Sequence, residues 1–168
     1  PVPSSAASDV YKRQVKGVEK VVSGYTRGDV PGRPTEREIC SGLTGAAEVI
    51  QITFDENIIS FEDILVVFMT THNPTTLNRQ GADRGSQYRS IICYHNSLQQ
   101  KISKEVIQQI QPYFNDTIVT EISESAIFYE ADQEHQDFYK NNIGQGYCTF
   151  VIEPKLAKLR KLHANKLK

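Results

Sequence analysis

The sequence of 168 residues has no tryptophan, one methionine and only three cysteines. Three cysteines are too few, and odd in number, for a disulfide scaffold, so we expect a reducing, cytoplasmic compartment. No apolar run approaches the roughly 20 residues that a membrane helix needs. The formal net charge is -1, which excludes a global field that would attract nucleic acid or an anionic membrane. We therefore expect no nucleic-acid partner and no membrane partner.

The composition that remains is ordinary for one globular domain, with 39% hydrophobic and 23% charged residues. Ser4 to Gln14 differs from the rest because it is small and polar, then basic, without an apolar period. This stretch resembles the in-frame translation of a transposase-type sequencing adapter, and such scars are kept out of fold reasoning. We interpret residues 1–14 as an artefactual or disordered N-terminal segment, and residues 15–168 as one domain.

Apolar periodicity along this domain predicts a mixture of strands and helices. The alternation of Ile50, Ile52 and Phe54 predicts a half-buried strand, and Ser60 is placed to cap a helix. The mixture predicts an α+β fold, a two-layer sandwich with a ferredoxin-like core and long loops. The expected strands are at 21–22, 47–55, 88–95, 118–122 and 148–152, the helices begin at 60, 97 and 132, and a basic amphipathic tail follows Pro154.

Two long loops, at 26–42 and 73–86, are the most informative segments, because loops of this length in a compact domain are usually functional or disordered. Specific polar residues are concentrated in and beside them, a pattern that suits a small polar group held in a mostly apolar pocket. The four histidines show no metal-ligand spacing. The polar residues are Cys40, Thr44, Glu48, His72, Asn73, Asp83, Gln87, Tyr88 and Arg89.

Three runs, Cys40 to Glu48, His72 to Ser90 and Gly144 to Cys148, resemble the A-type peptide methionine sulfoxide reductases. The resemblance extends from about Val15 to the basic tail. It implies thiol-dependent reduction of methionine S-sulfoxide, free or in oxidised proteins, without a prosthetic cofactor. An external dithiol such as thioredoxin would be the reductant and partner, and we expect a monomer.

The resemblance also assigns roles to residues. A thiolate attacks the sulfoxide sulfur while an acid protonates the oxygen, and a second cysteine then resolves the sulfenic acid as a disulfide. Glu48 matches the acid, which has to be protonated near neutral pH, and burial favours that form of a carboxyl group. Tyr88 would donate a hydrogen bond to the sulfoxide oxygen, and Asp83 would fix the backbone or a neighbouring donor. Cys148 would be the resolving cysteine.

Each of these residues also has a structural interpretation. Glu48 at a strand start is often a solvated charge, and Asp83 in a glycine-rich loop is often a turn residue that bonds its own backbone. Tyr88 at a strand start is often half-buried packing, and Cys148 could be a buried thiol. Cys93 is expected to be an inert core thiol.

The sequence departs from the family pattern at the most important position. The family nucleophile lies in a Gly-Cys-Phe-Trp run, which this sequence does not contain, and the adapter-like stretch stands where we expect it. Glu36, Ala46 and Arg27 also replace a tyrosine, a histidine and a glycine of the family. We therefore predict that this chain is an N-terminally truncated, inactive reductase. The alternative is a catalytically silent relative that binds sulfoxide or peptide ligands, and a thiol oxidoreductase is disfavoured because there is no Cys-x-x-Cys pair.

Overall fold

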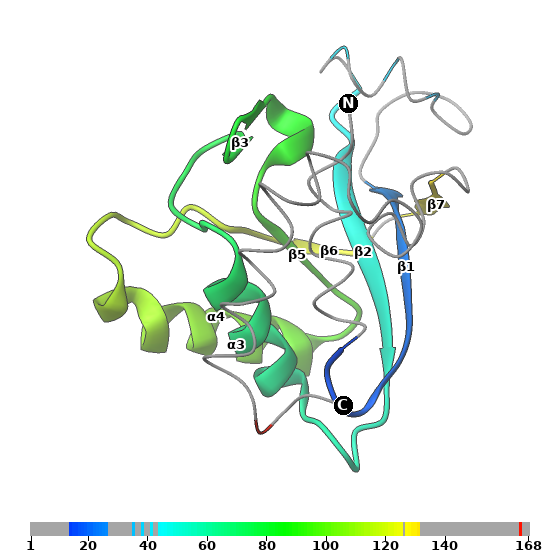
Figure 1. Ribbon diagram of the computed structural model, residues 1–168, viewed down its shortest axis with the longest axis vertical. Coiled ribbons are helices and arrows are strands. Elements are labelled where there is room, and N and C mark those ends of the chain that lie inside the picture. The colour runs from blue at the N-terminus through cyan, green and yellow to red at the C-terminus, as the bar shows by residue number, and fades with distance from the viewer. Residues whose placement is uncertain are drawn as a thin grey trace, which may run out of the picture. The chain divides into compact units, whose positions relative to one another are not determined.

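The computed structural model describes residues 14–26, 35, 38, 41, 44–125, 127–131 and 165 (Figure 1). The chain divides into two compact units, each of which is described here by itself. The first unit comprises Pro1–Gly24, Ile50–Thr71 and Glu130–Lys168, and the second comprises Tyr25–Val49 and His72–Tyr129.

A three-stranded sheet has the order β2-β1-β7. Its strands are β1 (Val18–Thr26), β2 (Ala47–Phe54) and β7 (Phe128–Glu130). β1 is much longer than the two-residue strand that the sequence predicts, because almost all of its side chains are buried and the apolar signal does not alternate. β7 was not expected from the sequence, since three residues are too few to carry a period.

The alternation predicted for β2 is confirmed. Ile50, Ile52 and Phe54 are half-buried, whereas Gln51 and Thr53 are exposed. This is the pattern of a strand with one face on the core. Its first residues, which belong to the second unit, carry Glu48.

The helix predicted after Ser60 is also confirmed as α3 (Phe61–Thr71). The Ser60 Oγ accepts a hydrogen bond of 3.1 Å from the backbone N–H of Asp63, which satisfies one of the unpaired donors at the helix start. Ile64, Leu65 and Met69 are buried on its apolar face, as their spacing predicts.

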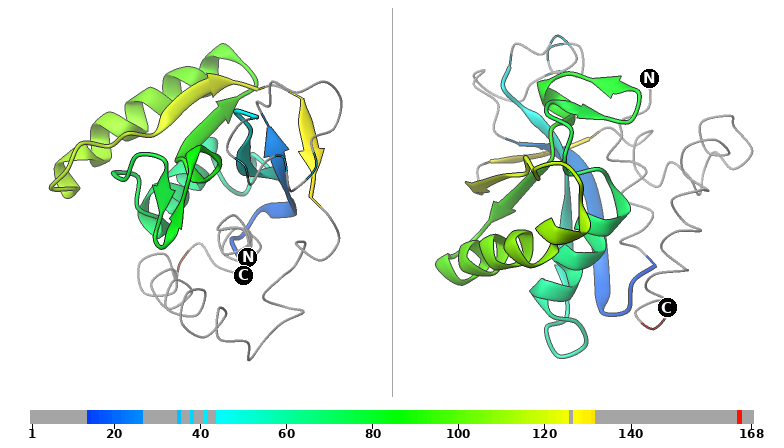
Figure 2. Two further views of the ribbon diagram at one scale, coloured as in Figure 1. Left: turned by 90° about the horizontal axis from the view of Figure 1, so that it is seen from above. Right: turned by 90° about the vertical axis from the view of Figure 1, so that its left-hand side faces the viewer.

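The second unit is built on a parallel pair of strands joined by a helix. β5 (Ile91–Tyr94) pairs with β6 (Glu121–Glu124), with Ile91 opposite Glu121 and Tyr94 opposite Glu124. The connection runs through α4 (Ser97–Ile110), which packs along both strands (Figure 2). Parallel strands need such a crossover, and this one buries Val106 and Ile110.

The helical spacing of Leu98, Ile102, Val106 and Ile110 predicts one buried face of α4, and this is wrong at Leu98. Leu98 lies in the first turn and its relative exposure is 63%, while Val106 further along the same helix is 1% exposed. The start of α4 is held by polar contacts instead. The side chain of Asn96 accepts a 2.9 Å hydrogen bond from the N–H of Gln99, and the side chain of Gln99 accepts one of 2.9 Å from the N–H of His95.

Several boundaries differ from prediction because long-range bonds fix them. Tyr88 is not the start of a strand but the end of a 3-10 turn, η1 (Ser86–Tyr88). β6 begins at Glu121, three residues later than Ile118, because the N–H of Val119 donates to the carbonyl of Pro74 at 2.8 Å instead of joining the strand ladder. A second 3-10 turn, η2 (Gln111–Tyr113), contains the proline expected to end α4.

The coarse fold class is therefore confirmed as a mixture of helices and open sheets, whereas the two-layer sandwich with a ferredoxin-like core stays a prediction. The helix at 132–141, the strand at 148–152 and the basic tail fall outside the described residues. Within the described part of the chain, no helix is long and apolar enough to cross a bilayer.

Candidate active site

Three of the four predicted site residues lie in the second unit. Glu48 is the second residue of β2 and is half-buried, with its Oε2 atom shielded from solvent. Tyr88 ends η1, and Asp83 begins the short strand β4 (Asp83–Arg84). Both are half-buried. The fourth, Cys148, lies outside the described residues, as do Cys40 and Glu36.

The loop that precedes Tyr88 is ordered by its own polar side chains. It contains a hairpin that the sequence analysis treated as loop, with β3 (Arg79–Gln80) antiparallel to β4. The Gln80 side chain bonds both the N–H and the C=O of Asn73, at 3.2 and 3.3 Å. The N–H of Gly85 donates to the carbonyl of Asn78 at 2.9 Å and closes the hairpin. Asp83 is thus the first residue of β4, paired with Gln80, and its assigned role stays a prediction.

A chain of hydroxyls joins the two ends of this loop. The Nε2 atom of His72 lies 2.7 Å from the Oγ of Ser90, which lies 2.8 Å from the Oγ1 of Thr120. Ser90 is only 6% exposed, so its hydroxyl needs these partners. These contacts hold Ser90, which lies in the connection between η1 and β5.

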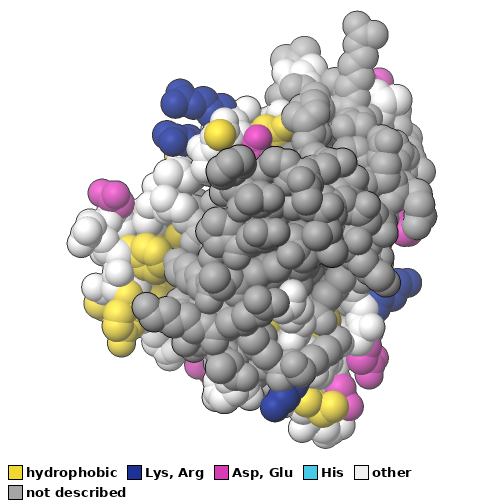
Figure 3. Space-filling view, in the orientation of Figure 1, with side chains coloured by type: hydrophobic (Ala, Val, Ile, Leu, Met, Phe, Trp, Pro, Cys, Tyr) yellow, Lys and Arg dark blue, Asp and Glu magenta, His cyan; other side chains and the backbone are white. Residues whose placement is uncertain are grey.

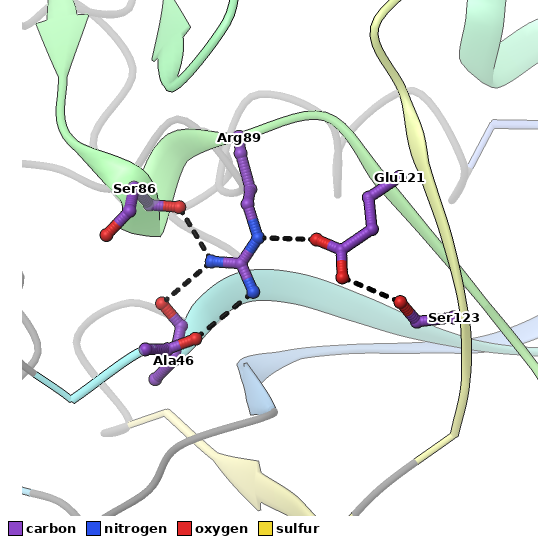
Figure 4. A network of polar contacts seen from close by, with 6 residues as sticks. Ala46, Ser86, Arg89, Glu121 and Ser123 are labelled. Carbon is purple, nitrogen blue, oxygen red and sulfur yellow. Dashed lines mark hydrogen bonds and ion pairs between the residues drawn. The ribbon is translucent and has the colours of Figure 1, made fainter.

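Arg89 bonds the backbone that leads into β2 and the backbone of η1 (Figure 4). Its Nη2 donates to the carbonyl of Gly45 at 3.1 Å, and its Nη1 donates to the carbonyls of Ala46 at 3.5 Å and Ser86 at 2.8 Å. One guanidinium therefore holds the residues just before Glu48 against the turn that contains Tyr88.

The charge of Arg89 is balanced by Glu121 on β6. The Nε of Arg89 lies 2.8 Å from the Oε2 of Glu121, and the two side chains are 16% and 39% exposed. The other carboxylate oxygen of Glu121 accepts a 2.7 Å hydrogen bond from Ser123. A paired guanidinium can bind carbonyls without leaving an uncompensated charge beside the site.

The segment before Glu48 is shaped by a turn. Thr44 is 2% exposed, and its Oγ1 accepts a 3.2 Å hydrogen bond from the N–H of Ala46. Gly45 has a φ of 70°, in the left-handed region that favours glycine. Ala46 is also 2% exposed.

Arg89 is among the polar residues that the sequence singles out, without a role, whereas Glu121, Ser123 and Thr120 were not predicted. No local signal identifies them, since Arg89 and Glu121 are 32 residues apart. Cys93 on β5 is half-buried rather than deep in the core. Among the described residues, no group of three or more His, Cys, Asp or Glu side chains could hold a metal ion.

Comparison with known proteins identifies the family. Residues 7–167 match the family described as peptide methionine sulfoxide reductase. The chain is 50% identical over 159 residues to the peptide methionine sulfoxide reductase MsrA of Saccharolobus solfataricus, covering 95% of this chain and 89% of that relative. It is 47% identical over 163 residues to the MsrA of Deinococcus radiodurans, covering 96% and 79%. The chain therefore belongs to the peptide methionine sulfoxide reductase family.

Solved structures agree with this assignment. Reduced Mxr1 from Saccharomyces cerevisiae superposes with a TM-score of 0.79 at 27% identity, covering 86% of this chain and 83% of that chain. Methionine sulfoxide reductase A of Corynebacterium diphtheriae gives 0.77 at 28% identity, covering 84% and 72%. Mxr1 in complex with Trx2 also has the same fold, with a TM-score of 0.54 at 20% identity and coverage of 82% and 81%. The recognition made from the sequence motifs is confirmed, and the family is one of enzymes that reduce methionine sulfoxide.

Proposed function

We propose that the unit around Glu48 binds methionine S-sulfoxide, free or in oxidised proteins, and is built for its reduction to methionine. The observation that carries this proposal is the Arg89 network. It joins the Gly45–Ala46 turn, two residues before Glu48, to the η1 turn that ends in Tyr88. A carboxyl group shielded from water favours its neutral form, which is the form that can give a proton to an oxygen.

The proposed reaction balances with two thiols from the protein. A thiolate attacks the sulfoxide sulfur, Glu48 gives its proton to the oxygen, and Tyr88 donates a hydrogen bond to the same atom. The products are methionine and an oxidised cysteine, from which Cys148 forms a disulfide and releases water. Asp83 positions the hairpin and the donors beside it. No prosthetic group enters this scheme.

An external dithiol would then reduce the disulfide. Thioredoxin is the reductant we propose, and support comes from the yeast relative Mxr1, whose structure exists in complex with Trx2. The chain itself would act as a monomer in the cytoplasm. The proposed fold of the whole domain is a two-layer sandwich with a ferredoxin-like core over residues 15–168, preceded by an artefactual or disordered segment at 1–14.

We further propose that this chain cannot complete the reaction. Its three cysteines are Cys40, Cys93 and Cys148, and none of them lies in a Gly-Cys-Phe-Trp run. Cys93 is on β5, where it is part of a strand instead of a helix start that would activate a thiol. Without the attacking thiolate, the site would bind a sulfoxide and leave it unchanged.

The second candidate is a catalytically silent relative whose function is binding. The buried Ala46 favours it, because a family histidine is replaced inside the turn that Arg89 holds. Glu36, which stands in place of a family tyrosine, also favours the silent relative. Both candidate functions use the same sulfoxide-binding site. They differ in whether the natural protein has a nucleophilic cysteine.

Binding of matched peptides tests the shared site. We expect a methionine S-sulfoxide peptide to bind about tenfold more tightly than its methionine counterpart, the size of one or two net hydrogen bonds. Glu48→Leu and Tyr88→Phe should each reduce this preference. Tyr113→Phe is the matched control, because Tyr113 is 86% exposed on η2 and should leave it unchanged. Equal binding of both peptides by the unaltered chain would refute the proposal.

A further inference from the structure

The β3–β4 hairpin carries two arginines on one face. Arg79 and Arg84 are directly opposite each other in the antiparallel pair, and Gln80 is opposite Asp83. Opposite residues of such a pair have side chains on the same face, and successive residues alternate between faces. The hairpin therefore has an arginine face, formed by Arg79 and Arg84, and a second face formed by Gln80 and Asp83.

The arginine face is the one open to solvent. Gln80 and Asp83 are half-buried, and the Gln80 side chain is tied to the backbone of Asn73. Arg79 and Arg84 are both exposed. In Figure 3, dark blue side chains protrude at the upper left, over the hairpin that Figure 1 labels at β3.

Among the described residues, no carboxylate forms an ion pair with either of the two arginines. Like charges directly opposite each other destabilise a strand pair, so Arg79 and Arg84 lower the stability of the hairpin. The Nε of Arg79 donates to the carbonyl of Gly81 at 2.7 Å, and neither arginine forms an ion pair in the described part of the chain. Arg89, a few residues further on, does have such a partner in Glu121. The arginine face is thus suited to an anion from outside the chain.

The backbone beneath this face is already fixed. Thr76 Oγ1 donates to the carbonyl of Arg79 at 2.8 Å, and the Gly85–Asn78 bond closes the far end of the hairpin. β4 carries Asp83 next to Arg84, and Gly85 leads directly into the turn that ends in Tyr88. An anion bound on the arginine face would therefore lie across the hairpin from Asp83 and four residues along the chain from Tyr88, on backbone that needs little further ordering.

We propose that the arginine face binds an aspartate or glutamate side chain of a peptide substrate, and that it selects oxidised methionines with acidic neighbours. Guanidinium groups pair with carboxylates through charge-assisted, often bidentate hydrogen bonds, which makes a peptide carboxylate the chemistry that fits. This inference rests on the proposed function, because it adds a flanking subsite to the same substrate.

Peptides with one central methionine S-sulfoxide and either aspartates, lysines or serines around it test the inference. We expect the acidic peptide to bind the unaltered chain about tenfold more tightly than the lysine peptide at low salt, and the difference to shrink as ionic strength rises. Arg84→Glu should abolish this difference, because the new carboxylate lies opposite Arg79 and cancels its charge. A general loss of structure would also abolish the sulfoxide preference of the serine peptide, which the loss of the arginine face alone leaves intact.

Lys104→Glu is the matched control, since Lys104 is an exposed cation on α4 and this change alters the net charge by the same amount away from the hairpin. It should leave the order intact. Equal affinities for the acidic and lysine peptides, or an order unaffected by Arg84→Glu, would overturn the inference. The serine peptide, compared with its unoxidised form, reports on the proposed function separately. If the serine peptide still binds more tightly in its sulfoxide form while the acidic and lysine peptides bind equally, the proposed function holds and the arginine subsite is refuted.

Discussion

At the scale of single residues, the site is organised by a side chain that does no chemistry. Arg89 binds the backbone carbonyls of Gly45, Ala46 and Ser86, which lie near Glu48 and Tyr88 along the chain. Motif resemblance proposes Glu48, Tyr88 and Asp83 as site residues, and these roles stay predictions. It does not predict the network, because the partner Glu121 comes from a strand that is distant along the chain.

We expect Arg89→Ala to lower the free energy of unfolding by about 2–4 kcal/mol, because several charge-assisted hydrogen bonds are lost and carbonyls are left without partners. Denaturant unfolding measures the change. The control is Lys101→Ala, which removes a 3.9 Å pair with Glu105 between well-exposed side chains. That pair should contribute no more than about 0.5 kcal/mol. A similar decrease in the free energy of unfolding of both variants would show that the hydrogen bonds of Arg89 contribute little to stability.

At the scale of elements, apolar periodicity predicts the helices and strands that are long and amphipathic. β2, α3 and most of α4 follow from their apolar spacing and from caps such as Ser60. The β3–β4 hairpin and η1 could not be predicted, because two or three residues carry no period. Side chain to backbone bonds such as those from Gln80 fix these elements instead.

The junction between β4 and η1 depends on a glycine. Gly85 has a φ of 139°, and a Cβ there would collide with the side-chain amide of Gln87, which is 4% exposed. We expect Gly85→Ala to lower the free energy of unfolding by about 2–4 kcal/mol, from backbone strain together with the steric clash.

Gly81→Ala is the comparison for this prediction. Gly81 has a φ of 58° and no atom within 4 Å of the added Cβ, so only the backbone penalty of about 1–2 kcal/mol applies. Urea unfolding of both variants measures the difference. Equal destabilisation would mean that the contact with Gln87 does not constrain the junction.

At the scale of the whole molecule, family membership and catalytic competence are separate properties. The match over residues 7–167 and the identity to the Saccharolobus relative place the chain among the methionine sulfoxide reductases. Its cysteines, by contrast, lack the sequence context of the family nucleophile. Sequence comparison establishes family membership. Catalytic competence depends on a single nucleophilic thiol, whose absence we infer from the sequence motifs.

The most direct test is a turnover assay of this chain with a methionine S-sulfoxide peptide and dithiothreitol, beside the Saccharolobus solfataricus relative as positive control. We predict that methionine appears no faster than without protein, although the sulfoxide peptide binds in preference to the methionine peptide. Sustained methionine formation at a rate comparable to the control would contradict the account, since one of Cys40, Cys93 or Cys148 would then have to be the nucleophile.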